Sequence, residues 1–231
     1  MNQYETWLAS MHTIYQKFES QMELATKNGM LPDPFVIDRK GGYFIFRRPD
    51  PRVATHVAKI GQMINTIAPS VAMYREISLH HTYTDYKVMS HCVPSTSADH
   101  KQTLEMFDEL VRKVVKRAKN PVSTYDRVLF GLNAFILTGK TDQSLYDDAC
   151  FIQEEAKKID VDLRLPWGTH VTFGRTIDVL TKEQGVLLKD LCTRNDLSLI
   201  GEFPFVSVEA GWYTIDVEHG FVPHITSAVN Y

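Results

Sequence analysis

The chain has 231 residues, of which 44% are hydrophobic and 23% are charged, and its formal net charge is −3. This composition is ordinary for a globular protein, and the length allows one large domain or two small ones. The slightly acidic charge disfavours binding to long nucleic acid, which needs a basic face. The three cysteines are widely spaced and contain no Cys-x-x-Cys pair, so neither a disulfide framework nor a zinc site is expected. A reducing, cytoplasmic setting is the simpler interpretation.

Neither a targeting segment nor a membrane span is expected. The N-terminal residues carry charges throughout and lack the apolar stretch of a signal peptide. No run approaches the ~18 apolar residues that a membrane-spanning helix requires. We therefore expect no membrane partner. The sequence does not determine the oligomeric state.

Residues 3–28 are predicted to form a helix, because apolar residues recur at spacings of three and four. These residues are Trp7, Leu8, Met11, Ile14, Tyr15, Phe18, Met22 and Ala25. Asn28-Gly29, followed by two prolines, ends the helix. We expect residues 1–34 to form a helical extension and residues 35–231 to form the main domain. A packing strap, a lid and a dimer element are the alternatives for the extension.

The remaining segments contain both strand and helix patterns. In chain order, we predict a strand at 42–47, a helix at 52–67, a strand at 72–86, a loop at 90–98, a helix at 98–119, a hairpin or two strands at 126–138, a helix at 143–158, a strand reached through 163–173, a helix at 180–194, and strands at 203–217 and 221–229. Strands and helices do not alternate regularly, so the order favours an α+β fold with two similar lobes in tandem over a parallel sheet.

Two predicted strands carry the same short motif, His80-His81-Thr82 in one and His170-Val171-Thr172 in the other. Residues i and i+2 of a strand point to the same face, so each motif presents one imidazole and one hydroxyl together. One His-x-Thr triplet is a weak signal. Two triplets in comparable positions of two predicted lobes indicate a shared pocket.

Such a pocket contains what cleavage of a phosphodiester needs. One group must deprotonate the attacking water or hydroxyl, and another must protonate the departing oxygen. Histidine suits both roles, because its ordinary pKa is about 6.5. The hydroxyls of Thr82 and Thr172 supply neutral donors for the phosphate oxygens. This set requires neither a metal nor a cofactor, and we predict none.

With these motifs the chain resembles the two-histidine (2H) phosphoesterase superfamily, which includes LigT-like RNA cyclic phosphodiesterases. The matching segments are 79–83, Leu-His-His-Thr-Tyr, and 167–173, Trp-Gly-Thr-His-Val-Thr-Phe. The resemblance implies a bilobal, pseudo-twofold α+β fold with two antiparallel sheets facing a central cleft and helices outside. It also implies His80 and His170 as general base and acid, Thr82 and Thr172 as phosphate ligands, and no metal.

Two alternatives remain within the motifs. His224-Ile225-Thr226 is a third triplet, but we prefer His170 because the superfamily has further strands after its second motif. At the first motif, His80 has a threonine two residues on, whereas His81 would be paired with Tyr83.

Three further features are weaker candidates. Arg175 is a possible phosphate contact, although strict alternation along the strand turns it away from Thr172. Residues 139–141, Gly-Lys-Thr, lack the upstream glycine of a P-loop and are interpreted as a turn. The aromatic residues considered for base stacking are Tyr43, Tyr74, Trp167 and Trp212.

The sequence thus predicts a metal-independent phosphodiesterase acting on a small nucleotide or short oligonucleotide. The substrate classes are a cyclic or 2′,5′-linked oligonucleotide, such as an immune second messenger, and an RNA 2′,3′-cyclic phosphate. The absence of a basic surface favours the short or cyclic substrates. The alternative is a protein that binds a nucleotide without cleaving it and acts as a sponge or sensor.

Overall fold

The computed structural model describes residues 2–89, 98–117, 122–131, 133–218 and 220–231. The helices of this part are α1 (Gln3–Asn28), α2 (Pro34–Ile37), α3 (Pro51–Ile67), α4 (Ala98–Arg117), α5 (Ser144–Lys157) and α6 (Lys182–Cys192), with short 3-10 turns at Glu76–Ser78 and Asn195–Leu197. The strands are β1 (Gly41–Arg48), β2 (Val71–Met73), β3 (His81–Met89), β4 (Val122–Gly131), β5 (Ala134–Thr141), β6 (His170–Thr176), β7 (Leu199–Pro204), β8 (Ser207–Asp216) and β9 (Gly220–Asn230).

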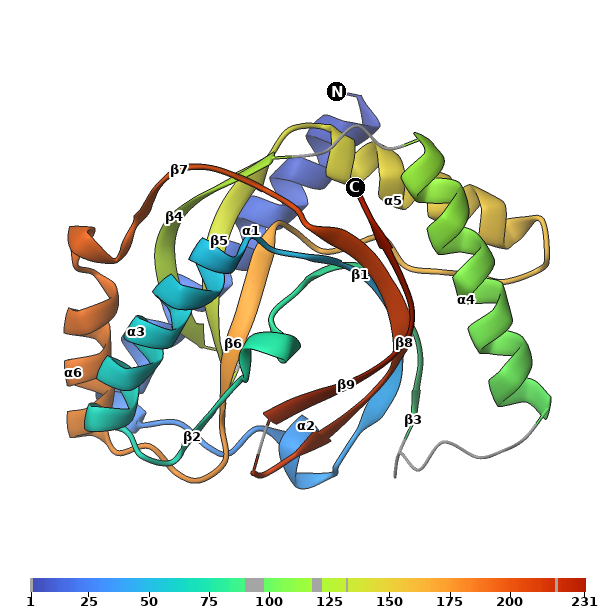
Figure 1. Cartoon of the computed structure of the whole chain (residues 1–231). Coiled ribbons are helices and arrows are strands. Elements are labelled where there is room, and N and C mark those ends of the chain that lie inside the picture. The colour runs from blue at the N-terminus through green and yellow to red at the C-terminus, as the bar shows by residue number, and fades with distance from the viewer. Residues whose placement is uncertain (1, 90–97, 118–121, 132, 219) are drawn as a thin grey trace.

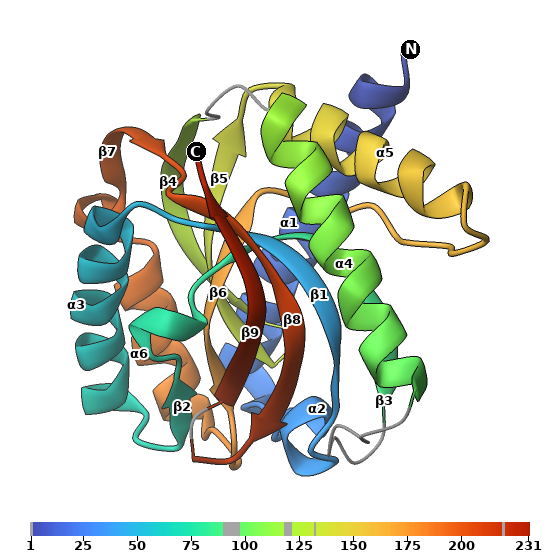
Figure 2. The same cartoon turned by 45° about the vertical axis from the view of Figure 1, so that its right-hand side comes forward.

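The strands form two antiparallel sheets that face each other (Figure 1). The first sheet has the order β3-β1-β8-β9, and the second has the order β2-β6-β5-β4-β7. Helix α4 packs across β8 and β9 on the outside of the first sheet (Figure 2). Helices α1 and α6 pack against each other and against β4 on the outside of the second. The predicted fold class, α+β with two antiparallel sheets and external helices, is confirmed.

The lobes are interleaved along the chain, which differs from the predicted tandem order. The predicted strand at 72–86 is two strands, because the 3-10 turn at Glu76–Ser78 carries the chain from β2 in the second sheet to β3 in the first. The predicted strand at 203–217 likewise divides into β7 and β8, which belong to different sheets. Apolar alternation marks a strand but not its partner, so these crossings have no local signal. Of the predicted loop at 90–98, residues 90–97 lie outside the described part.

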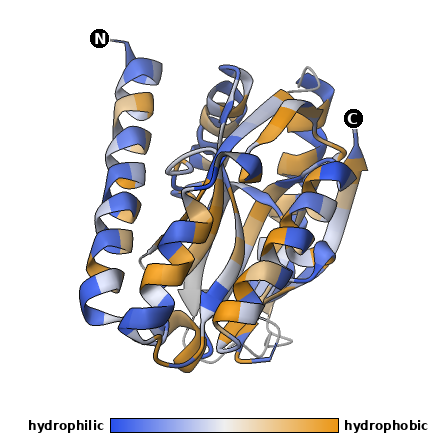
Figure 3. Cartoon of the chain, turned by 90° about the vertical axis from the view of Figure 1, so that its left-hand side faces the viewer, coloured by the Kyte–Doolittle hydropathy of each residue, from blue (hydrophilic) through white to orange (hydrophobic). Residues whose placement is uncertain are grey.

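Helix α1 forms where the sequence predicted it, and both ends have a physical cause. Asn2 accepts a hydrogen bond from the Glu5 amide while the Glu5 side chain accepts from the Asn2 amide, a reciprocal cap of the first turn. Gly29 ends the helix at φ 71°, a conformation that favours glycine. The inner face of α1 belongs to the same hydrophobic core as both sheets. Figure 3 shows mostly hydrophilic residues on the outward face of α1. None of the described helices is long and apolar enough to cross a membrane.

A buried ion pair joins the first sheet to α5, the helix that follows β5 of the second. The Arg47 guanidinium lies 2.6 Å from the Asp148 carboxylate, and the side chains are 0% and 6% exposed. The Tyr83 hydroxyl donates to the same carboxylate at 2.9 Å and accepts from Arg47. Removing one partner leaves a buried charge without compensation, which is far more costly than losing a surface pair.

We therefore predict that Asp148→Ala lowers the free energy of unfolding by about 3–5 kcal/mol. Urea denaturation measures this change. The control is Asp196→Ala, which removes an exposed partner of Arg194 and is expected to change stability little. Equal effects of the two substitutions would contradict the structural role given to the Arg47–Asp148 pair.

Candidate active site

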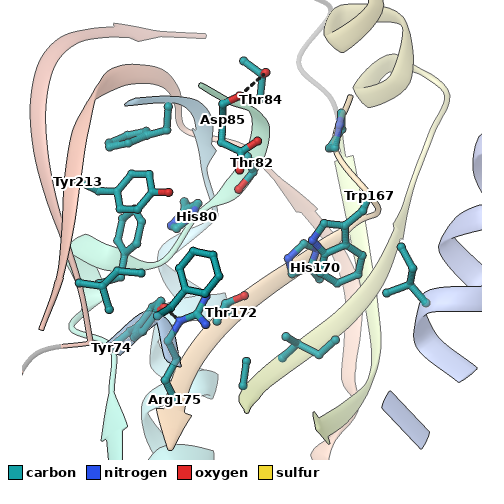
Figure 4. Close-up of a pocket in the computed structure, with 18 of the residues that line it drawn as sticks. Tyr74, His80, Thr82, Thr84, Asp85, Trp167, His170, Thr172, Arg175 and Tyr213 are labelled. Carbon is teal, nitrogen blue, oxygen red and sulfur yellow. Dashed lines mark hydrogen bonds between the residues drawn. The ribbon is translucent and has the colours of Figure 1, made fainter. Parts of the chain in front are cut away.

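One cavity of about 500 Å³ lies between the two sheets and brings both motifs together. His80, just before β3, and Thr82 in β3 line it from one side, and His170 and Thr172 line it from β6. The two rings stand on either side of the cavity, as Figure 4 shows. The convergence that the sequence suggested is therefore present in the structure.

The two histidines are held in the same way. Nδ1 of His80 donates a hydrogen bond to the Ser78 carbonyl at 2.7 Å, and Nδ1 of His170 donates to the Gly168 carbonyl at 3.3 Å. In each case the acceptor is the carbonyl two residues earlier. A carbonyl can only accept, so Nδ1 carries the proton and Nε2 of the neutral ring is left as a proton acceptor. Each imidazole thus has one nitrogen bound by the backbone and one available for chemistry.

Of the two histidines of the first motif, His81 does not line the cavity. Its Nε2 lies 2.7 Å from the Tyr125 hydroxyl of β4, and its side chain is 1% exposed. Tyr83, its neighbour on the same face, belongs to the buried Arg47 network. His80, rather than His81, therefore shares the cavity with Thr82.

A β-bulge turns Arg175 into the cavity, which corrects the prediction from strict alternation. Thr172 pairs with Ile136, whereas Arg175, three residues later, pairs with Ala134, only two residues away on β5. Ile136 and Ala134 both line the cavity, and so do their partners. The extra residue in β6 resets the alternation. The sequence carried no clear signal for it.

The first sheet has a matching bulge in β3. Thr82 pairs with Phe46, and Asp85 pairs with Phe44, so three residues on β3 correspond to two on β1. Asp85 is exposed and lines the cavity together with Phe44. The third residue after each motif threonine therefore faces the cavity, as a carboxylate in one lobe and as a guanidinium in the other. Sequence reasoning missed Asp85.

Arg175 is fixed in place by two neighbours. Its Nε donates to the Tyr74 hydroxyl at 2.6 Å, and its guanidinium forms an ion pair with Asp33. Burial lowers the pKa of Arg175, but the charge interactions with Tyr74 and then Asp33, together with the hydrogen bonds to both, outweigh it and raise the pKa above its usual value. The arginine thus keeps its positive charge at the cavity wall, with Asp33 as its counter-ion.

Both catalytic candidates have a lowered pKa. Burial lowers the pKa of His80 to about 4, and the positive charges of Arg48 and Arg175 act in the same direction against the Ser78 hydrogen bond. Burial also lowers the pKa of His170 to about 3, with the Gly168 hydrogen bond opposing it and His80 and Arg175 adding to it. Both rings are therefore neutral near pH 7 in the free protein.

The aromatic candidates divide between the cavity and the rest of the first sheet. Tyr74 and Trp167 line the cavity. Tyr74 is engaged with Arg175, and the Trp167 ring lies 3.5 Å from the His170 ring at 23°. Tyr43 and Trp212 do not line the cavity. Neither of these two is therefore placed to stack a base there.

His224 does not join the two motifs. Its ring stacks on Trp212 at 3.5 Å and 7°, and it is not among the residues that line the cavity. Residues 139–141 complete β5 and thus belong to a strand, not to the turn that the sequence suggested. Among the described residues, no three histidine, cysteine, aspartate or glutamate side chains gather as a metal site would require.

No protein-family model matches the sequence, and no curated protein is significantly similar to it. Among solved structures, TT0787 of Thermus thermophilus matches with a TM-score of 0.50 at 10% identity, over 82% of this chain and 97% of that one. E. coli LigT in apo form matches with a TM-score of 0.48 at 10% identity, over 83% and 98%. Kluyveromyces marxianus Usb1 matches with a TM-score of 0.40 at 13% identity, over 84% and 99%.

These likenesses concern the fold. TT0787 and this chain share it over nearly the whole length of TT0787. The structure has the two antiparallel sheets that the resemblance implied, and both motifs lie at the cavity between them.

The lowered pKa values predict a loss of stability in acid. The pKa of each ring in the folded protein is below its value of about 6.5 in the unfolded chain, so the unfolded state binds the protons first. The free energy of unfolding is therefore at its full value with respect to these two rings above pH 6.5, and it declines as the pH falls toward 4. For His80, each pH unit crossed costs about 1.4 kcal/mol at most. Urea denaturation across this range should show a shallower decline for His80→Gln than for the wild type. An unchanged slope would contradict the burial of a neutral ring.

Proposed function

We propose that the protein is a metal-independent phosphodiesterase of the 2H phosphoesterase type that cleaves a phosphodiester in a small nucleotide or short oligonucleotide. His80 and His170 are its catalytic pair, and Thr82 and Thr172 bind the phosphate. The proposal rests on one observation: both histidines and both threonines line the same cavity.

The geometry supports acid–base catalysis by the two imidazoles. One histidine takes the proton from the attacking water or ribose hydroxyl as the new bond to phosphorus forms. The other gives a proton to the departing oxygen as the old bond breaks. The threonine hydroxyls donate to the non-bridging oxygens, where negative charge develops. After this step the first histidine is protonated and the second is neutral. A second step with the roles reversed, or proton exchange with the solvent, restores the starting state.

The negative charge of a bound substrate favours uptake of the proton that this cycle needs from the solvent. In the free protein both rings are neutral, because burial and Arg175 lower their pKa values. A bound phosphodiester brings a negative charge, which raises the pKa of a nearby imidazole and favours one protonated ring. Binding is therefore expected to take up a proton.

Arg175 orients the phosphate in this proposal. Its guanidinium attracts the phosphate, whereas the carboxylate of Asp85 in the other lobe repels it. The phosphate would therefore lie on the Arg175 side of the cavity, with an uncharged part of the nucleotide near Asp85.

A cavity of about 500 Å³ fits a small ligand better than a long polymer. Together with the net charge of −3, this supports a cyclic or 2′,5′-linked oligonucleotide, such as an immune second messenger, over long RNA. An RNA end with a 2′,3′-cyclic phosphate is the second substrate class.

We expect His80→Ala and His170→Ala each to lower kcat by at least about 10²-fold, the lower range for loss of a general acid or base. Cleavage of 2′,3′-cyclic, 2′,5′-linked and cyclic dinucleotide substrates in excess EDTA is the assay. The control is His224→Ala, which removes an imidazole outside the cavity and should leave turnover unchanged. Near-wild-type turnover by His170→Ala would refute the assignment.

The same assay separates cleavage from sequestration. Chromatography of each ligand after incubation shows products if the protein is an enzyme and intact ligand if it only binds. Tight binding of a nucleotide that returns intact, with both histidines present, would favour the sponge or sensor.

Arg175→Met should weaken binding and turnover together. It removes a cation from a cavity that must hold an anion, at a cost of about 2–3 kcal/mol in kcat/KM, or roughly 30- to 150-fold. Arg194→Met, at an exposed ion pair remote from the cavity, is the control. An unchanged kcat/KM in Arg175→Met would show that the phosphate lies elsewhere.

A further inference from the structure

The backbone segment before His80 is held by a side chain from a neighbouring strand. Arg48 donates to the Ile77 carbonyl at 2.6 Å and to the Leu79 carbonyl at 2.9 Å. Glu209 holds Arg48 in turn through a two-point ion pair. The Ser78 carbonyl between them accepts from His80 itself. The carbonyls one, two and three residues before the histidine are therefore all engaged.

The segment before His170 is held in a matching way, but by helix α1. The Trp7 indole nitrogen donates to the Pro166 carbonyl at 2.5 Å, and the Tyr15 hydroxyl donates to the Thr169 carbonyl. Side chains of α1 thus donate to the carbonyls one and four residues before the histidine. The carbonyl two residues before it, at Gly168, accepts from the ring, as at His80.

Helix α1 also packs directly on this segment. A Cβ at Gly168 would lie 2.6 Å from Cγ of Met11, so only glycine allows the helix to come this close. The sulfur of Met11 accepts the Thr169 amide at 3.4 Å. These two contacts leave the segment little room to move away from its hydrogen bonds.

Helix α1 also makes aromatic contacts with this segment. The Phe18 ring stacks with Trp167 at 6.1 Å and 17°, and the Tyr15 ring meets Trp167 edge-on at 6.1 Å. Trp167 in turn stacks on His170. Every residue from Pro166 to Thr169 is therefore in contact with α1.

We propose that α1 is the positioning element of His170. Trp7, Met11 and Tyr15 hold the segment 166–169 so that the His170 ring keeps its Nδ1 proton on the Gly168 carbonyl and presents Nε2 to the phosphate. None of these three residues lines the cavity, so each acts through His170. The inference rests on the proposed function. Of the three alternatives for α1 it favours the packing strap, and it gives α1 the part that Arg48 plays for His80.

The test is a pair of conservative substitutions in the full chain. Tyr15→Phe removes one hydroxyl and keeps the buried ring, and Trp7→Phe removes the indole donor. Trp7→Phe releases the Pro166 carbonyl, and Tyr15→Phe leaves the Thr169 carbonyl with the Gly139 amide as its remaining donor. Because a small displacement of a catalytic group is costly, we expect kcat to fall about tenfold or more while KM stays within about twofold. Tyr4→Phe is the matched control, since its ring packs on Trp7 and Tyr146 of the same region rather than on the segment.

NMR of the ¹⁵N-labelled histidine rings supplies a readout that general destabilisation does not mimic. In Tyr15→Phe and Trp7→Phe, the His170 signals should move toward a mixture of tautomers while the His80 signals stay unchanged. The proposal is overturned if the His170 signals are unaffected, if both rings change together with a falling Tm, or if kcat keeps its wild-type value. The NMR experiment needs no substrate. If the wild-type protein cleaves no nucleotide, the proposed function fails, and the tautomer of His170 still decides whether α1 positions it.

Discussion

The register of two strand pairs is the constraint on which the candidate site depends. Thr172 lies opposite Ile136 in the second sheet, and Thr82 lies opposite Phe46 in the first. Because side chains alternate along a strand, a slip of one residue in either pair would turn an imidazole and a hydroxyl away from the cavity. The bulge that follows each motif then adds a charged residue, Asp85 in one lobe and Arg175 in the other.

The two motifs are alike in sequence but unlike in support. His80 lies among phenyl rings, with Phe221 at 4.6 Å, and Arg48 holds the preceding backbone. His170 lies against the indole of Trp167, and α1 holds its preceding backbone. The same local geometry is thus reached by two different routes. Helix α1, which the sequence presents as an extension of the main domain, thus supports the backbone before one catalytic candidate.

Much of the fold could be predicted because its signals are local. The spacing of apolar residues indicated α1 and α4, and the alternation around the two His-x-Thr triplets indicated the residues that face the cavity. The strand crossings from β2 to β3 and from β7 to β8 could not be predicted, because pairing partners are set by distant residues. Arg175 was misplaced for a related reason, since the bulge in β6 depends on its pairing with β5.

The central claim is that His80 and His170 act on one phosphorus atom as a single unit. Turnover of the His80→Ala/His170→Ala double variant, compared with each single variant, tests it most directly. Groups that share one reaction are grossly non-additive, so the double variant should be about as slow as either single variant. Losses that multiply in the double variant would mean that the two rings contribute independently, and would contradict the account.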